Sequence, residues 1–113
     1  MQLQTQTRPK VISVSVLEDR IAAATAIQFK EQMRDAPKDG PPRVVLDLAR
    51  VQFLDSSGLG AIVAVKKLLG PDRVLELSGL TPTVEKVFRL TRMDSIFTIH
   101  LSVELAVSHA ASA

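Results

Sequence analysis

Two adjacent serines follow an aspartate in residues 55–60 (DSSGLG), between a short apolar stretch and a helix-like apolar segment. A serine hydroxyl can accept a phosphoryl group, and backbone N–H groups at the start of a helix are unpaired. The helix dipole also favours negative charge there, so a phosphate on Ser56 or Ser57 would occupy a favourable position. Without further context, simple helix capping by Asp and Ser is the more ordinary interpretation of these residues.

Serine catalysis has little support in the sequence. A nucleophile elbow requires a glycine two residues before the serine, and neither Ser56 nor Ser57 has one. The two histidines, His100 and His109, lie in a predicted strand and near the C-terminus, so neither is an evident base. We therefore expect no catalytic residues and no enzyme activity.

Cofactor and metal signatures are also missing from the sequence. The phosphate-loop pattern G-x-x-x-x-G-K-[ST] does not occur, since Lys66 and Lys67 lie a helical turn or more beyond Gly60. No glycine-rich dinucleotide fingerprint follows the first predicted strand, the acidic residues are dispersed, and the chain has no cysteine. We expect neither a cofactor nor a metal site.

The length and composition predict one compact domain. The chain has 113 residues, of which 46% are apolar, enough to build a core. We predict a single domain over residues 1–113, with its core at about 11–107 and loosely ordered ends at 1–8 and 110–113.

The charge pattern excludes some classes of partner. The formal net charge is +2, basic residues are scattered from Arg8 to Arg92, and there is no Trp or Tyr. Nucleic-acid binding is therefore not expected. The N-terminus lacks an apolar signal segment, and no apolar run is long enough to cross a bilayer. We expect a cytoplasmic protein without direct membrane insertion, and the oligomeric state stays open.

Strand-like and helix-like segments alternate along the chain. Apolar residues alternate with serines over residues 11–17, which predicts a half-buried strand. Further strands are predicted at 44–48, 74–77 and, more weakly, 96–101. Helices are predicted at about 25–34, at about 57–69, from Pro82 with Thr81 as its N-cap, and from the capping residue Ser102 to about His109.

This alternation predicts an α/β domain with a largely parallel sheet of about four to five strands and about four helices. In such folds, functional sites gather at the carboxyl ends of strands. Residues 55–60 follow the predicted strand at 44–48, so we place the candidate site there.

The second predicted helix has two apolar sides. At about 100° per residue, one broad face is predicted to pack on the sheet. It contains Ala61, Ile62, Val65, Leu68 and Leu69. Leu59 and Val63 fall on the opposite side, where they form either a docking patch beside the serines or a surface that another part of the chain covers.

Residues 44–68 (VVLDLARVQFLDSSGLGAIVAVKKL) closely resemble the STAS domain of bacterial anti-sigma-factor antagonists. The likeness continues through residues 77–107 (LSGLTPTVEKVFRLTRMDSIFTIHLSVELAV). Thr25-Ala26, followed by Phe29 and Met33, resembles the first helix of that family. The resemblance therefore covers residues 11–107.

The resemblance implies a partner-switching protein. The unphosphorylated form would bind an anti-sigma factor that is also a serine kinase and so free the sigma factor. Phosphorylation of Ser56, the first serine after Asp55, would release it, and a serine phosphatase would reset it. An alternative is a STAS accessory subunit of a membrane transporter ATPase complex of the phospholipid type.

The resemblance also implies which residues contact the partner. Asp55 and Ser57 flank the phosphoacceptor, and the glycines Gly58 and Gly60 would shape the contact together with Leu59. Asp47 matches an acid often found in the preceding strand of the family. Many members also carry an aspartate in the turn before the first helix, and this position is Ala22 here.

Overall fold

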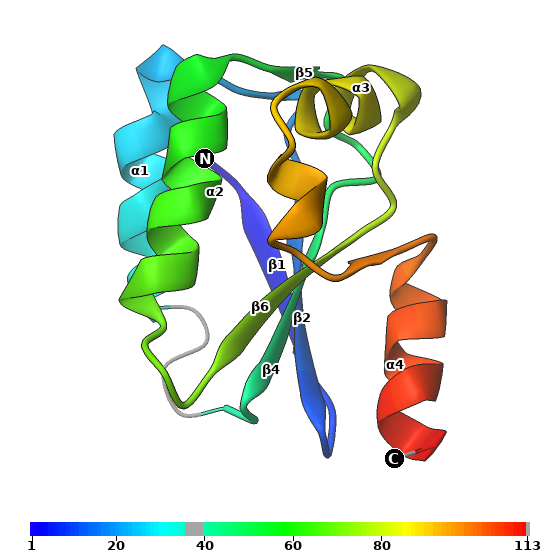
Figure 1. Ribbon diagram of the computed structural model, residues 1–113. Coiled ribbons are helices and arrows are strands. Elements are labelled where there is room, and N and C mark those ends of the chain that lie inside the picture. Colours follow the sequence, from blue (N-terminus) through cyan, green and yellow to red (C-terminus); the bar gives the residue numbers. More distant parts are fainter. Residues whose placement is uncertain (36–39, 113) are drawn as a thin grey trace.

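The computed structural model describes residues 1–35 and 40–112, and Figure 1 shows their arrangement. Five strands form one sheet in the order β1-β2-β4-β6-β7. They are β1 (Leu3–Thr7), β2 (Val11–Val16), β4 (Arg43–Asp47), β6 (Val74–Ser78) and β7 (Ile99–His100). β1 pairs antiparallel with β2, and the other neighbours are parallel. A separate parallel ribbon pairs β3 (Arg20–Ile21) with β5 (Phe53–Leu54).

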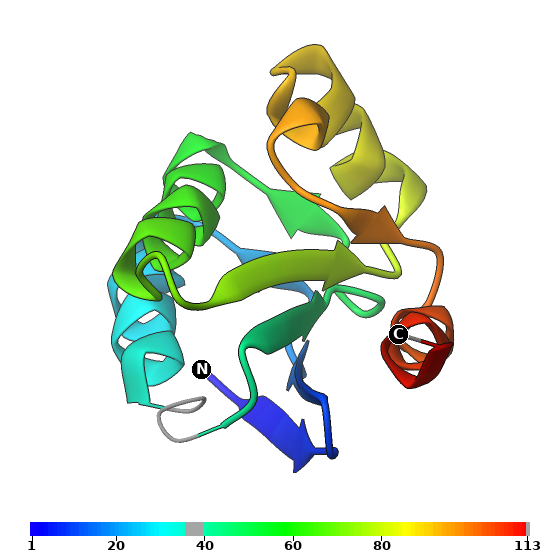
Figure 2. The same ribbon diagram turned by 60° about the horizontal axis from the view of Figure 1, so that its bottom comes forward.

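The helices cover both faces of this sheet. They are α1 (Ala23–Asp35), α2 (Ser56–Leu68), α3 (Pro82–Leu90), the 3-10 helix η1 (Met93–Ser95) and α4 (Val103–Ser112). Figure 2 shows α1 and α2 side by side on one face of the sheet, with α4 on the opposite face. The predicted α/β architecture with a mostly parallel sheet and four α-helices is confirmed.

The main core lies between the sheet and the pair of helices α1 and α2. From β2 and β4 it receives Ile12, Val14, Val16, Val44 and Leu46. From the helices it receives Ala26, Phe29, Met33, Ala61, Ile62 and Val65. Under α4, on the other face, a smaller cluster contains Val11, Val45 and Ala106. β4 is therefore buried on both faces, as its nearly continuous apolar sequence predicts.

The N-terminal end differs from the prediction. Residues 3–7 do not form part of a loose end but the edge strand β1, with Leu3 opposite Val16 and Thr7 opposite Ile12. The side chains of β1 are mostly exposed, so the strand carries little apolar signal in its sequence. Backbone hydrogen bonds to β2 order it instead.

The C-terminal half also refines the predicted elements. Of the strand predicted at 96–101, only Ile99–His100 forms β7, which follows η1 (Met93–Ser95) after a short connection. Ser102 caps α4 as predicted, since its Oγ accepts a hydrogen bond from Leu105 N at 3.2 Å. Thr81 precedes α3 but makes no side-chain cap; its hydroxyl instead donates to Val51 O at 2.7 Å. α4 continues to Ser112, past the predicted end.

Two predictions fall partly outside the described residues. The segment between the helix predicted at about 25–34 and the strand predicted at 44–48 includes residues 36–39, and the predicted loose C-terminal end includes residue 113. Neither segment belongs to the described part of the chain.

The predicted core face of α2 is right for three residues and wrong for Leu68. Ala61, Ile62 and Val65 are buried, and Leu69 is half-buried, but Leu68 is 47% exposed. Leu68 lies at the edge of the apolar face on the helical wheel, and it lines a surface groove toward α1.

Candidate functional site

Asp55 joins the starts of the two helices that cover the main core. It is the N-cap of α2, and its Oδ1 accepts a hydrogen bond from Gly58 N at 2.8 Å. Its Oδ2 accepts a second hydrogen bond from Ala23 N, in the first turn of α1, at 3.1 Å. One carboxylate therefore satisfies free N–H groups at both helix N-termini.

The same hydrogen bonds set the charge of Asp55. The hydrogen bond from the Gly58 N–H is the main cause that lowers the pKa of the Asp55 carboxyl. Desolvation acts in the opposite direction, and the hydrogen bond from the Ala23 N–H lowers the pKa further. Asp55 is therefore ionised at neutral pH, and a negative charge is already present beside the serines.

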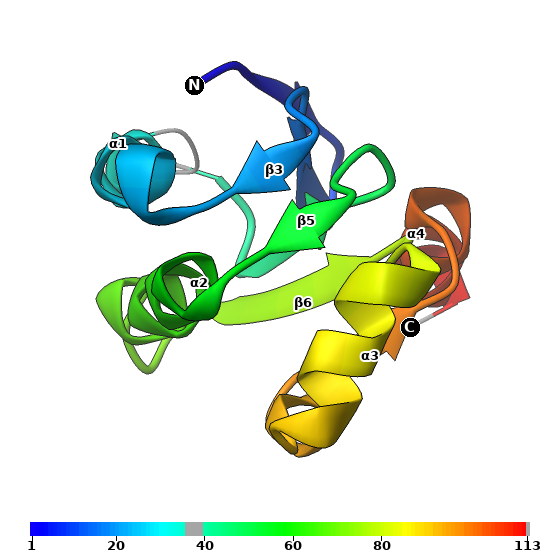
Figure 3. The same cartoon turned by 90° about the horizontal axis from the view of Figure 1, so that it is seen from above.

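Ser56 and Ser57 are exposed in the first turn of α2, at one end of the molecule. Seen from above in Figure 3, α1 and α2 lie beside the ribbon of β3 and β5, on the side away from α4. Both serine side chains are therefore accessible from solvent.

The two glycines of the segment have different surroundings. A Cβ at Gly58 would lie 2.0 Å from Ile21 O and 2.8 Å from Leu54 Cδ1. Gly58 is buried, which conflicts with the prediction that it contacts a partner; its role is to let α2 approach the ribbon of β3 and β5. A Cβ at Gly60 would meet nothing within 4 Å, and Gly60 is exposed.

Asp47 does not join the serine turn. Side chains alternate along β4, so Asp47 points to the same face as Val45, which packs under α4. Leu46 points to the other face, into the main core. Its carboxylate accepts hydrogen bonds from Ser15 Oγ at 3.1 Å and from Ala49 N at 3.0 Å. Asp47 therefore holds the end of β4 on the face opposite to α1 and α2.

The sequence leaves open whether Leu59 and Val63 form a docking patch or are covered by another part of the chain, and the structure lies between these alternatives. Both are half-buried, and both pack against the main core cluster. Part of each side chain is therefore covered by the chain itself, and the remaining part is all that a partner could touch.

Ala22 directly precedes α1 and lies close to the serine turn. Its carbonyl accepts hydrogen bonds from Thr25 N at 2.9 Å and Ala26 N at 2.8 Å, and so opens α1. The next residue, Ala23, donates to Asp55. An aspartate at this position would add a second carboxylate near the turn, and this chain has a methyl group instead.

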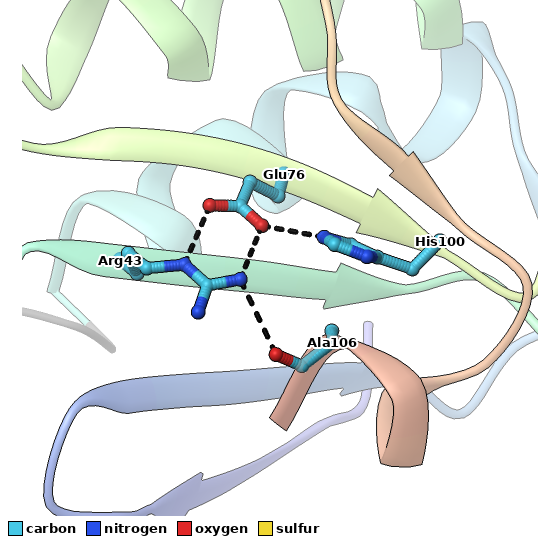
Figure 4. Close-up of polar contacts among 4 residues, drawn as sticks. All are labelled: Arg43, Glu76, His100 and Ala106. Carbon is cyan, nitrogen blue, oxygen red and sulfur yellow. Dashed lines mark hydrogen bonds and ion pairs between the residues drawn. The ribbon is translucent and has the colours of Figure 1, made fainter. Parts of the chain in front are cut away.

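The sequence did not predict a buried polar network that lies on the α4 side of the sheet. Figure 4 shows Glu76 of β6 between Arg43 of β4 and His100 of β7. Arg43 donates from Nε at 2.7 Å and from a terminal nitrogen at 2.6 Å, and His100 Nε2 lies 2.6 Å from Glu76 Oε1. Arg43 also donates to Ala106 O of α4 at 3.3 Å.

The network keeps its charges by mutual contact. Burial raises the pKa of the Glu76 carboxyl, but the hydrogen bonds from Arg43 and His100 outweigh it and hold this pKa below its usual value. The hydrogen bonds that Arg43 donates to Glu76 raise the pKa of the Arg43 guanidinium. In the sequence, the only sign of this network is a charged residue in each of two largely apolar strands, Arg43 in β4 and Glu76 in β6. That these two side chains meet follows from the pairing of β4 with β6, which the sequence alone does not give.

The described part of the chain offers neither a cluster of metal ligands nor a membrane-spanning helix. Within residues 1–35 and 40–112, no group of three or more His, Asp or Glu side chains could hold a metal ion. None of the described helices is both long and apolar enough to cross a membrane.

Comparisons with known proteins agree on one family. Residues 2–106 match the family described as STAS domain. The chain is 32% identical over 96 residues, 84% of its length and 83% of the relative's, to BtrV of Bordetella bronchiseptica, described as a candidate anti-sigma factor antagonist. A crystal structure of an anti-sigma factor antagonist from Mycobacterium paratuberculosis has a TM-score of 0.85 at 25% identity, covering 97% of this chain and 93% of that chain.

The fold is also that of SpoIIAA, an anti-sigma factor antagonist solved in two states. The unphosphorylated form has a TM-score of 0.78 at 18% identity, covering 99% of this chain and 98% of that chain. The phosphorylated form, from Bacillus, has a TM-score of 0.69 at 17% identity, covering 96% of this chain and 98% of that chain.

Proposed function

The chain belongs to the anti-sigma factor antagonists of the STAS domain family, and we propose that it binds an anti-sigma factor until Ser56 is phosphorylated. The observation that carries this proposal is the exposed Ser56 directly after the helix-capping Asp55. The existence of SpoIIAA in phosphorylated and unphosphorylated forms supports it by analogy. The anti-sigma factor, itself a serine kinase, would be the partner, in the cytoplasm where sigma factors act.

In the proposed cycle the protein acts by binding and serves as the substrate of two enzymes. The kinase transfers the γ-phosphoryl group of ATP to Ser56 Oγ; the new O–P bond replaces the bond to the β-phosphate, ADP leaves, and the hydroxyl proton is lost. A serine phosphatase later hydrolyses the ester and restores the hydroxyl. Neither step requires a cofactor held by this chain.

Phosphorylation would act on the complex more than on the fold. The phosphate adds a charge of about −1.5 to −2, which the N-terminus of α2 tolerates in water. In an interface, the dianion must be desolvated beside the ionised Asp55. A cost of about 3 kcal/mol would weaken binding roughly 100-fold, since each 1.4 kcal/mol is tenfold in affinity.

The test incubates the protein with its purified cognate anti-sigma factor kinase and ATP, and it locates the phosphate by mass spectrometry. We expect one phosphate on Ser56, none on a Ser56→Ala variant, and normal labelling of a matched Ser57→Ala variant. Calorimetry should show wild-type binding and a roughly 100-fold weaker Kd for the phosphoprotein. Labelling of Ser56→Ala at Ser57 or elsewhere would refute the assignment of the acceptor.

The same experiment separates the alternative function. If the wild-type protein does not bind the anti-sigma factor but co-purifies with a transporter ATPase from its host, the partner-switching proposal is wrong. Phosphorylation of Ser56 would then not be expected to control the interaction.

A further inference from the structure

A groove of about 540 Å³ runs between α1 and α2 on their outer side. Its apolar lining is formed by Ile27 of α1 and by Ala64 and Leu68 of α2. Ile27 is 65% exposed and Leu68 is 47% exposed, although each is a large aliphatic residue. Ala64, a small half-buried residue of α2, lines the groove beside them. Two aliphatic side chains thus face one hollow from neighbouring helices.

The rim of the groove is mostly basic. Lys30 and Arg34 of α1 and Lys67 of α2 line it, together with one acid, Glu31. None of these three cations forms an ion pair with another described residue. Three positive charges against one negative charge leave a net charge of +2 around an apolar centre. The chemistry that complements it is an aliphatic side chain flanked by carboxylates.

The groove lies on the same helix pair as the proposed phosphorylation site. Ala23, at the start of α1, is hydrogen-bonded to Asp55, and Ile27 follows one turn later. On α2, Ala64 is eight residues after Ser56, about 12 Å along the helix at about 1.5 Å per residue. Figure 1 shows the two helices side by side over this length. A partner that covers Ser56 can therefore extend into the groove.

The backbone of the groove selects the form of the partner. Both walls are helices, whose N–H and C=O groups are already bonded within each helix. An extended peptide would find no strand edge here and would leave its own backbone unpaired. A helix satisfies its backbone internally and presents residues at i, i+3 and i+4 on one side.

We propose that this groove binds an amphipathic helix of the anti-sigma factor, which places an aliphatic side chain between Ile27 and Leu68 and carboxylates against Lys30, Arg34 and Lys67. The inference rests on the proposed function, because it names the part of the partner that docks beside the phosphorylation site. Contacts in the groove contribute to the affinity for the anti-sigma factor, and phosphorylation of Ser56 lowers that affinity.

The first test is binding of the purified anti-sigma factor, measured by calorimetry at two salt concentrations. The double variant Ile27→Ala/Leu68→Ala should weaken binding at least about tenfold, and so should Lys30→Glu/Arg34→Glu. Matched controls on α3 are Leu90→Ala, at a residue that is 70% exposed, and Lys86→Glu. They should bind as the wild type does. Melting temperatures of all variants should agree, because the altered side chains are outside the core.

The second test maps the occupant, and it is helped by the absence of cysteine from the chain. A photo-crosslinker attached to the single thiol of an Ile27→Cys variant should react with an acidic amphipathic helix of the anti-sigma factor. The same reagent on a Leu90→Cys control should not. Crosslinks to a second copy of this chain, or to another part of the anti-sigma factor, would overturn the proposal.

The outcomes distinguish this inference from the proposed function. If the wild type binds the anti-sigma factor and phosphorylation releases it, but all groove variants bind with wild-type affinity, only the groove inference is wrong. If the wild type does not bind at all, the proposed function fails first.

Discussion

The serine turn and the buried Arg43–Glu76–His100 network hold negative charge in opposite ways. In the turn, the Asp55 carboxylate lies at the surface and is held by backbone N–H groups of two helices. In the network, the Glu76 carboxylate is buried, with a side chain 8% exposed, and is held by other side chains. Water screens an added charge well at the exposed turn and much less at the buried network.

This difference separates a place suited to regulation from a place suited to holding the fold together. In the proposed cycle, a phosphate beside Asp55 would change what can bind there and would leave the core unchanged. Removing the Glu76 carboxylate leaves the half-buried Arg43 guanidinium without its anionic partner, so the fold bears the cost. The two regions lie on opposite faces of the sheet, which lets one change without disturbing the other.

The largest effect is expected for Glu76→Ala. Loss of the carboxylate leaves the Arg43 guanidinium without its buried partner, which should lower the free energy of unfolding by about 3–5 kcal/mol. The control is Glu85→Ala, which breaks an exposed pair with Arg89 on α3 and should cost no more than about 0.5 kcal/mol. Urea unfolding measures both. If Glu76→Ala and Glu85→Ala lower the free energy of unfolding equally, buried and exposed ion pairs do not differ in this protein as we expect.

A pair of glycine variants tests the serine turn from within. Gly58→Ala places a methyl group against Ile21 O and should destabilise the fold by about 1–3 kcal/mol. Gly60→Ala meets open space in the same helix and should be neutral or stabilise it by up to about 1 kcal/mol, because alanine favours helix. Thermal unfolding compares them. A stable Gly58→Ala protein would show that α2 can move away from the ribbon of β3 and β5.

Asp55→Ala removes the cap of α2 and the hydrogen bond to Ala23. We expect a lower melting temperature than for a Ser57→Ala control, with a smaller decrease than for Glu76→Ala, because the lost bonds are at the surface. Hydrogen exchange should increase in the first turns of both α1 and α2. An increase confined to α2 would mean that Asp55 does not tie the two helices together.

The free energy of unfolding should fall in acid as the carboxyls of Asp55 and Glu76 become protonated. The pKa values of Asp55 and Glu76 are both lowered in the folded protein, so the folded state binds fewer protons than the unfolded chain in acid. Their contribution is therefore complete above the ordinary carboxyl range of about pH 4 and is lost as the pH falls through the lower folded values. Urea unfolding between pH 7 and pH 3 should show this decline, with a shallower decline for Glu76→Gln. An unchanged slope in Glu76→Gln would assign the acid sensitivity to other groups.

The smallest effect on the fold is expected for Ser56→Asp. A negative charge at an exposed helix N-terminus should change the free energy of unfolding by less than about 1 kcal/mol, if anything toward stability. The same variant should bind the anti-sigma factor more weakly than the wild type. If Ser56→Asp unfolds the protein as Glu76→Ala does, then the turn is not independent of the core.

Local patterns in the sequence were sufficient for much of the fold. The alternation of residues 11–17, the apolar run at 44–48 and the helical spacing of Ala26, Phe29 and Met33 predict elements that the structure contains. The position of residues 55–60 at the start of a helix follows from capping preferences, which act within a few residues. Periodicity and capping are local, so one chain segment reveals them.

The tertiary structure alone decided which residues meet across the sheet. Residues 3–7 carry no apolar alternation, and only pairing with β2 makes them a strand. β4 is buried on both faces, so its sequence does not tell which face Asp47 occupies, and the structure places it away from Ser56. Glu76 finds Arg43 and His100 from 33 and 24 residues away. Strand register sets these contacts, and register depends on how distant segments pack, which no local pattern records.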